Sequence, residues 1–161
     1  MADSKQFDPN KAMEDIKKDR NLALIAGGAA VLLVGMFLPW VSVEAAFLDY
    51  SANGFDANGW FPVILAVVAV AAALNVMNQD KKTMAIVALV ASGLGALIVL
   101  LDWPDTSDTL GVVSVGLGYY LSLAGGVAMT VGSFFKFQKD SGGTTASAPA
   151  PKAEETEEKE E

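Results

Sequence analysis

Charged side chains are missing from four long stretches of this chain. The stretches cover residues 22–40, 60–78, 83–101 and 110–135. A helix needs about 20 apolar residues to cross the ~30 Å hydrocarbon core of a bilayer. A buried helix of a soluble protein seldom runs that long without a polar stripe. The sequence therefore predicts an all-α membrane protein, a bundle of four transmembrane helices. The last stretch is longer than one crossing needs, so we expect it to tilt or to extend beyond the bilayer.

Composition narrows the chemistry that such a bundle can perform. The 161 residues are 52% hydrophobic, carry a net charge of −8, and include no cysteine and no histidine. Thiolate chemistry, a histidine base and the usual zinc sites are therefore excluded, and the acidic balance argues against nucleic acid. The four stretches also contain no ionisable carrier for a proton path. We predict that the protein is not an enzyme, with no catalytic residue, cofactor or metal ligand.

The basic residues predict the orientation of the chain. Five precede the first stretch, two lie between the second and third, and four follow the fourth, whereas residues 41–59 and 102–109 contain none. Basic loops stay in the cytoplasm. The pattern therefore predicts a multi-pass protein of the cell membrane, inner or plasma, with both termini cytoplasmic. Trp40, Trp60, Phe61 and Trp103 fall at the outer ends of the stretches, as in an aromatic belt.

A cleaved signal peptide is the alternative interpretation of the first stretch. Lys17, Lys18 and Arg20 resemble the basic region of a signal, and residues 43–45 resemble a cleavage site. The polar arm of 21 residues and the long apolar core instead favour an uncleaved anchor. The choice remains open from the sequence alone.

Three segments lie outside the predicted bundle of residues 22–138. In the cytoplasmic arm, residues 1–21, Asp8 and Pro9 predict the start of a short helix that runs toward the first span. In the first outer loop, alternation from Val41 and Asn-Gly pairs indicate a small β-hairpin. The acidic tail, residues 139–161, has no aromatic or large aliphatic residue and is predicted to be disordered. The acidic residues of the two outer loops leave a cation site as a further alternative, and Asp108 is expected to cap the fourth span.

Small residues give the fourth stretch its most specific pattern. Glycines recur there every seven residues, and a seven-residue period keeps one seam toward a partner helix. Small residues allow helices in lipid to approach closely. Residues 26–30 of the first stretch are also all alanine or glycine, so packing within the bundle and packing against another subunit are both open. The predicted helix-packing interface consists of Gly111, Ser114, Gly118, Ser122, Gly125, Ala128 and Gly132.

Short motifs at the ends of the spans suggest a family resemblance. The first span ends in Leu38-Pro39-Trp40, the outer loop closes at Gly59-Trp60, and the last span contains Gly118-Tyr119-Tyr120. On these motifs, residues 20–137 resemble small bacterial four-span membrane proteins of uncharacterised function. The resemblance implies the four-span fold and no particular activity. The plan is also similar to claudin-like tetraspan proteins, but the two loop cysteines of that family are missing.

The patterns together favour a protein that works by binding other proteins in the lipid bilayer. We predict a non-catalytic accessory, assembly or scaffold protein that docks through its glycine-rich fourth helix. Its partners are expected to be other membrane protein subunits or a second copy of itself. A small homo-oligomeric channel or transporter is the alternative.

Overall fold

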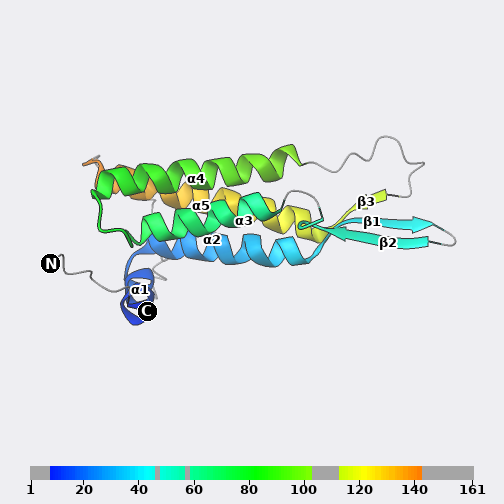
Figure 1. Ribbon diagram of the computed structural model, residues 1–161, viewed down its shortest axis with the longest axis horizontal. Coiled ribbons are helices and arrows are strands. Elements are labelled where there is room, and N and C mark those ends of the chain that lie inside the picture. The colour runs from blue at the N-terminus through cyan, green and yellow to red at the C-terminus, as the bar shows by residue number, and fades with distance from the viewer. Residues whose placement is uncertain (1–7, 46–47, 57–58, 103–112, 143–161) are drawn as a thin grey trace, which may run out of the picture.

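A computed structural model describes residues 8–45, 48–56, 59–102 and 113–142. Four helices of this part of the chain lie side by side along one axis (Figure 1). A short helix turns away at one end of this bundle, and a small sheet extends from the other end. The elements in chain order are α1 (Pro9–Lys18), α2 (Arg20–Phe37), β1 (Pro39–Ala45), β2 (Leu48–Asn53), α3 (Trp60–Ala73), α4 (Lys81–Leu101), β3 (Val113–Val115) and α5 (Leu117–Asp140).

Three helices in the described part of the chain are long and apolar enough to cross a membrane. They are α2, α4 and α5, with 18, 21 and 24 residues. The fourth helix of the bundle, α3, is apolar but has only 14 residues, which is about 21 Å at 1.5 Å per residue. The described part of the chain is thus mostly helical, with three long candidate membrane spans and one shorter apolar helix.

Helix α3 ends earlier than expected because two asparagines turn the chain. The sequence predicts a span to residue 78, but the helix stops at Ala73. Asn75 and Asn78 both have φ 51°, a left-handed conformation that asparagine tolerates better than most residues. The Asn75 side chain also bonds both ways to the backbone of Gln79, at 3.1 Å each. Absence of charge therefore overestimates the length of this helix, because uncharged amides can also end a helix.

Helix α5 begins later than expected because the preceding residues form a strand. The predicted span starts at residue 110, but β3 pairs with β1 and the helix starts at Leu117. The N-cap is Gly116, whose N–H donates to Trp40 O at 2.7 Å. Asp108, the expected cap, lies outside the described residues. At its other end the helix continues to Asp140, past the expected limit of residue 135, and residues 143–161 of the predicted tail lie outside the described residues.

Direct backbone contact joins α2 to α5. A Cβ added at Gly125 would lie 2.6 Å from Gly28 O, and one added at Gly28 would lie 2.7 Å from Gly125 O. One added at Gly132 would lie 2.9 Å from Ile25 Cγ1. At each of these glycines, atoms of the other helix therefore fill the space that a side chain would take. The contact is the most extensive between any two elements of the described chain, and it requires that no side chain intervene.

Helix α4 packs against α5, and α3 packs in turn against α4. Gly126 faces α4, since a Cβ there would lie 3.2 Å from Ala96 Cβ. Helix α3 packs chiefly on α4 and much less on α2. Two clusters of buried side chains fill the interior: one around Leu32, Met36 and Tyr119, and the other around Ile25.

The sheet has strand order β2-β1-β3 with both pairs antiparallel. A hairpin is present as expected, but its strands are joined between Ala45 and Leu48, and the first Asn-Gly pair, expected as a turn of the hairpin, begins at Asn53, the last residue of β2. A third strand joins the sheet from the segment before α5. The pairing of β1 with β2 is irregular between Pro39 and Val41, as in a β-bulge, which re-aims the side chain at that point. The residue at the irregularity is Trp40.

Trp40 fixes the base of the sheet to the bundle. The residue is 2% exposed, and its Nε1–H donates to Gly35 O at 3.0 Å. Its ring meets that of Tyr119 edge to face, with the centroids 5.4 Å apart. Its expected place in a lipid-facing aromatic belt is therefore wrong. Trp60 and Phe61 are 63% and 60% exposed, and Trp103 lies outside the described residues.

The short helix α1 begins as the sequence predicts. The Asp8 carboxylate accepts from Asn10 N at 2.9 Å, and Pro9 is the first helical residue. The helix does not run on into α2, because Asp19 adopts an extended conformation between them. The Asp19 carboxylate then caps α2 by accepting from Asn21 N at 2.9 Å.

The glycine contact between α2 and α5 predicts opposite effects of the same substitution at two sites. Gly125→Ala should destabilise the protein by about 1–3 kcal/mol, because the new methyl group overpacks the contact. Gly93→Ala, in α4, meets nothing within 4 Å and should be stabilising by about 0.5–1 kcal/mol. Unfolding by SDS titration in mixed micelles measures both. Equal effects of the two substitutions would refute the close contact.

The Trp40 anchor predicts a difference between two Trp→Phe substitutions. Trp40→Phe leaves the buried carbonyl of Gly35 without its indole donor, and should cost about 1–3 kcal/mol. Trp60→Phe, at an exposed ring, should stay within about 0.5 kcal/mol of the parent. The same titration, followed by protease cleavage within residues 39–53, measures stability and sheet anchoring together. A loss at Trp60 that matched the loss at Trp40 would contradict the anchor.

Candidate functional site: an apolar groove between α2 and α3

The structure distributes the predicted packing residues among three places. Gly118, Ser122, Gly125 and Gly132 are buried, and an added Cβ on each of the glycines would meet α2 or the residue that follows it. Ala128 is half-buried. Ser114 is not on the helix: it lies exposed in β3, where its hydroxyl donates to Ser42 O at 3.3 Å. Gly111 lies outside the described residues.

This placement determines which faces of α5 are open. Its glycines meet α2 on one side and α4 on the other. Large side chains form its exposed face, with Tyr120, Val127 and Val131 between 40% and 51% exposed. A partner could reach the glycine rows only by displacing another helix of the same chain. An open surface of small residues is instead found elsewhere on the bundle.

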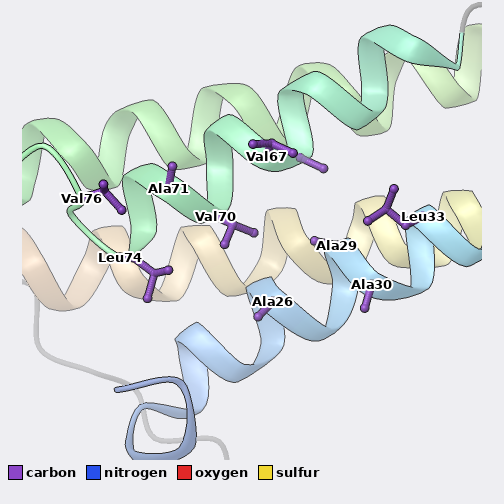
Figure 2. A pocket seen from close by; sticks show the side chains of 10 residues that line it. Ala26, Ala29, Ala30, Leu33, Val67, Val70, Ala71, Leu74 and Val76 are labelled. Atoms are coloured by element: carbon purple, nitrogen blue, oxygen red, sulfur yellow. The ribbon is translucent and has the colours of Figure 1, made fainter. Parts of the chain in front are cut away.

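Such a surface lies between α2 and α3, where the two helices diverge. A groove of about 400 Å³ opens there, and Figure 2 shows side chains of both helices along it. Small residues contribute much of its wall, with Ala29 and Ala66 the most buried among them. The lining residues are Ala26, Ala29, Ala30, Leu33, Ala66, Val67, Val70, Ala71, Leu74 and Val76.

The lining of the groove limits what it can bind. Every lining side chain is alanine, valine or leucine, so no side chain offers a hydrogen bond, a charge or a nucleophile. Burying a polar solute there without a partner would cost several kcal/mol. The groove therefore suits hydrocarbon or the apolar face of a helix, and its alanines allow a helix backbone to come close.

The sequence analysis identified the small residues on the α2 wall of this groove but not those on the α3 wall. Residues 26–30 stand out as a run of small residues, but the sequence does not show that Gly28 meets α5 while its neighbours Ala26 and Ala30 line the groove. On α3 the signal is the pair of alanines Ala66 and Ala71 among valines. Placed on two helices, the small residues of α2 and the two alanines of α3 could have indicated that these two helix surfaces face each other.

The alternative of a cation site in the outer loops receives no support from the described residues. No group of three or more acidic, cysteine or histidine side chains in that part of the chain could hold a metal ion. Asp102 ends α4 as its C-cap, whereas Asp105 and Asp108 lie outside the described residues.

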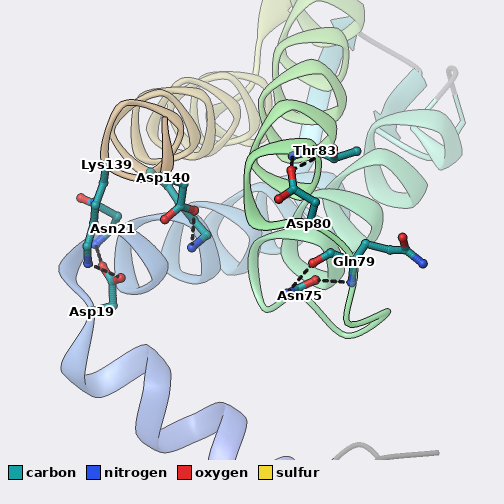
Figure 3. Close-up of polar contacts among 9 residues, drawn as sticks. Asp19, Asn21, Asn75, Gln79, Asp80, Thr83, Lys139 and Asp140 are labelled. Atoms are coloured by element: carbon teal, nitrogen blue, oxygen red, sulfur yellow. Dashed lines mark hydrogen bonds and ion pairs between the residues drawn. The ribbon is translucent and has the colours of Figure 1, made fainter. Parts of the chain in front are cut away.

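Charged side chains gather at the end of the bundle opposite the sheet, as Figure 3 shows. Lys139 Nζ lies 3.0 Å from Asp19 Oδ2, which joins the end of α5 to the start of α2. Lys136 pairs with Asp140 at 3.2 Å along α5. Asp80 caps α4 by accepting from the N–H and hydroxyl of Thr83, at 3.1 and 3.2 Å.

The Asp19 carboxyl has a lowered pKa. Partial burial acts to raise the pKa, but the hydrogen bonds from Lys139 and from the Asn21 N–H, with the charges of Lys139 and Lys136, together outweigh it. The ionised form is therefore the one that the folded protein favours, and it holds α2 and α5 in register at this end.

Comparisons with known proteins do not assign this chain to a family. A scan against protein-family models finds no match, and searches of the curated proteins and of the solved structures find none either.

The lowered pKa predicts how stability changes in acid. A depressed folded pKa contributes stability above the unfolded pKa, and this contribution is lost as the pH falls through the folded value. The ordinary value is 3.8, so the parent should lose stability below about pH 4. Asp19→Asn should flatten this part of the profile, and Lys139→Gln should make the acid loss smaller, because without the lysine the folded pKa of Asp19 rises toward its unfolded value. SDS titration across the acid range checks both, and identical profiles for all three proteins would contradict the pairing.

Proposed function

We propose that this chain is a non-catalytic accessory or scaffold protein of a cell membrane. In this proposal it holds a transmembrane helix of a larger partner subunit in the groove between α2 and α3. The observation that carries the proposal is the groove itself, an open and wholly apolar surface with alanines on both walls. The docking site thus moves from the glycine-rich α5 to α2 and α3, because α2 and α4 already occupy the glycines of α5.

The proposal includes four membrane crossings, with α3 as the second. Helix α3 lies alongside the three longer helices (Figure 1), and its described side chains are apolar from Trp60 to Ala73. Helix α1, the connection from α3 to α4 and the end of α5 all lie at one end of the bundle. The described basic residues are also at this end, which is therefore the cytoplasmic end by the positive-inside rule.

A helix fits the groove better than a polar solute does. The lining runs from Ala26 to Leu33 on α2, a distance of about two helical turns. Opposite it lie Ala66 to Ala71 of α3, and Leu74 and Val76 of the segment after α3. The gain from such docking is van der Waals contact, because lipid tails are as apolar as the groove. A helix with its own small residues would gain most, since both backbones could then approach.

Filling the groove should release the partner. Ala30→Leu and Ala71→Leu each place a larger side chain in the groove, where close approach has no room for it. Ala23→Leu is the matched control, because Ala23 is exposed on α2 and does not line the groove. We expect gentle extraction of the parent and of the control to recover a stoichiometric complex with an unlike membrane protein. The two groove variants should recover the chain without it.

Two results would contradict this function. If both groove variants retained the same partner, the docking site would lie elsewhere on the protein. A pure homo-oligomer that conducts ions or solutes in liposomes would support the channel or transporter instead. Mass spectrometry of the intact extracted particle distinguishes the two, because it reports which subunits are present and how many of each.

A further inference from the structure

Apolar and charged side chains are separated around the short helix α1. Ala12, Met13 and Ile16 lie at helical spacings that place them on one side, the apolar face of α1. The opposite side carries Glu14 and Lys18, which pair with each other. The helix as a whole is polar. A helix that is polar overall but has one apolar face is typical of helices that lie at a membrane surface.

The position of α1 places it at such a surface. The helix runs across the axis of the bundle at the end opposite the sheet (Figure 1), and Figure 3 shows it leading away from Asp19. Asp19 alone separates it from α2, a candidate membrane span that begins at Arg20. The inner end of α1 is therefore at the depth where that span enters the bilayer. A helix that runs across the span at this depth lies along the membrane surface.

The inner end of α1 shows which way its apolar face points. Ile16 is half-buried and packs against the cluster of buried side chains around Ile25. The apolar face is therefore turned toward the apolar part of the bundle. Met13 lies on the same face one turn farther from α2, and it is 57% exposed. Beside the bundle at this depth, the surroundings of such a side chain are lipid headgroups and the adjoining acyl chains.

The charges of α1 fit a surface of lipid phosphates. Residues 8–20 include four basic and four acidic side chains. Three of the acidic ones are already bonded to other groups of the chain: Asp8, Glu14 and Asp19. Three of the basic ones form no ion pair with another described residue: Lys11, Lys17 and Arg20. Attraction to headgroups falls off within about a Debye length, about 8 Å, so this local balance decides more than the net charge of −8.

The undescribed parts of the chain offer little to cover the apolar face of α1. Residues 143–161 contain no aromatic and no large aliphatic side chain. Residues 46–47, 57–58 and 103–112 join elements at the sheet end of the bundle, which is the opposite end. Residues 1–7 precede α1 directly and include Phe7, so the test below treats that segment separately.

We propose that α1 binds the surface of the bilayer that the bundle crosses, with anionic phospholipid as its ligand. Met13 enters the interface between headgroups and acyl chains, and the three unpaired basic side chains reach the phosphates while their stems stay near the apolar layer. This contact depends on the crossing of the membrane by α2. It does not depend on the groove between α2 and α3, so partner docking and lipid contact can fail separately.

The absence of cysteine from the chain allows each side of α1 to carry a single fluorescent label. Met13→Cys places the label on the apolar face, and Glu14→Cys places it on the opposite side at the next residue. The full chain is reconstituted at low density into vesicles of phosphatidylcholine and phosphatidylglycerol that contain a lipid with a nitroxide near the headgroup. We expect the nitroxide to quench the Met13→Cys label several-fold more than the Glu14→Cys label.

A label on α2 separates this proposal from the crossing itself. Val31 is 40% exposed, and a nitroxide deep in the acyl chains should quench a label at Val31→Cys. Deep quenching there, with equal shallow quenching on the two sides of α1, would overturn the lipid contact alone. If none of the three labels were quenched, both the crossing and the lipid contact would be overturned.

The basic side chains have a test of their own. Replacing all three unpaired basic residues by glutamine in the Met13→Cys chain should lower the quenching to its level in vesicles of phosphatidylcholine alone. Replacing Lys81 and Lys82 is the matched control, because both are exposed at the same end of the bundle but belong to α4. The control should leave the quenching unchanged. Equal effects of the two replacements would contradict anionic phospholipid as the ligand.

Phe7→Ser in the Met13→Cys chain tests the segment that precedes α1. The quenching should stay the same, because in this proposal lipid and not residues 1–7 covers Met13. Weak quenching in the parent that rises several-fold in the Phe7→Ser variant would show that this segment is the cover, and would overturn the proposal.

Discussion

The contact between the backbones of α2 and α5 is the constraint on which the other parts of the structure depend. Inside a bilayer, apolar side chains gain little by hiding from lipid, so helices associate through close packing. Gly28 and Gly125 supply that packing, because each would clash with the other helix if it carried a Cβ. Once α5 is held against α2, its Gly126 receives α4, and α4 in turn carries most of the contact with α3.

The same contact also positions the sheet. Gly116 brings the start of α5 against β1, where its N–H bonds to Trp40 O. Trp40 then packs on Tyr119 in the first turn of α5 and bonds back to Gly35 of α2. One side chain thus connects both helices of the central pair to the strand that lies between β2 and β3. The sheet is a continuation of the bundle at its base and a separate surface at its tip.

Because the glycines of α5 already contact α2 and α4, the open surfaces of the protein lie elsewhere. Helix α2 has only limited contact with α3, and the apolar groove lies where the two diverge. The apolar face of α1 is the second open surface, at the same end as the ion pair of Asp19 and Lys139. The proposed function rests on the groove, whose lining side chains are all apolar.

The sequence predicted the elements that depend on local pattern and missed those that depend on distant contacts. Absence of charge located α2 and α4 to within a few residues, because the bilayer acts on each helix separately. It misplaced the start of α5, where Ser114 bonds to Ser42, 72 residues away in sequence. It also placed Trp40 in an aromatic belt at the membrane surface, since no local pattern indicates that Tyr119 and Gly35 lie next to that ring. The seven-residue glycine period was visible, but not which helix would fill it.

The measurement that tests this account most directly is the accessibility of single cysteines on the two sides of the membrane. A membrane-impermeant maleimide applied to intact cells should label Ser51→Cys, on the exposed sheet, and should label neither Glu14→Cys in α1 nor Asn78→Cys after α3. Permeabilised cells should label all three. Labelling of Asn78→Cys together with Ser51→Cys in intact cells would show that α3 does not cross the membrane, and would contradict the four-crossing bundle.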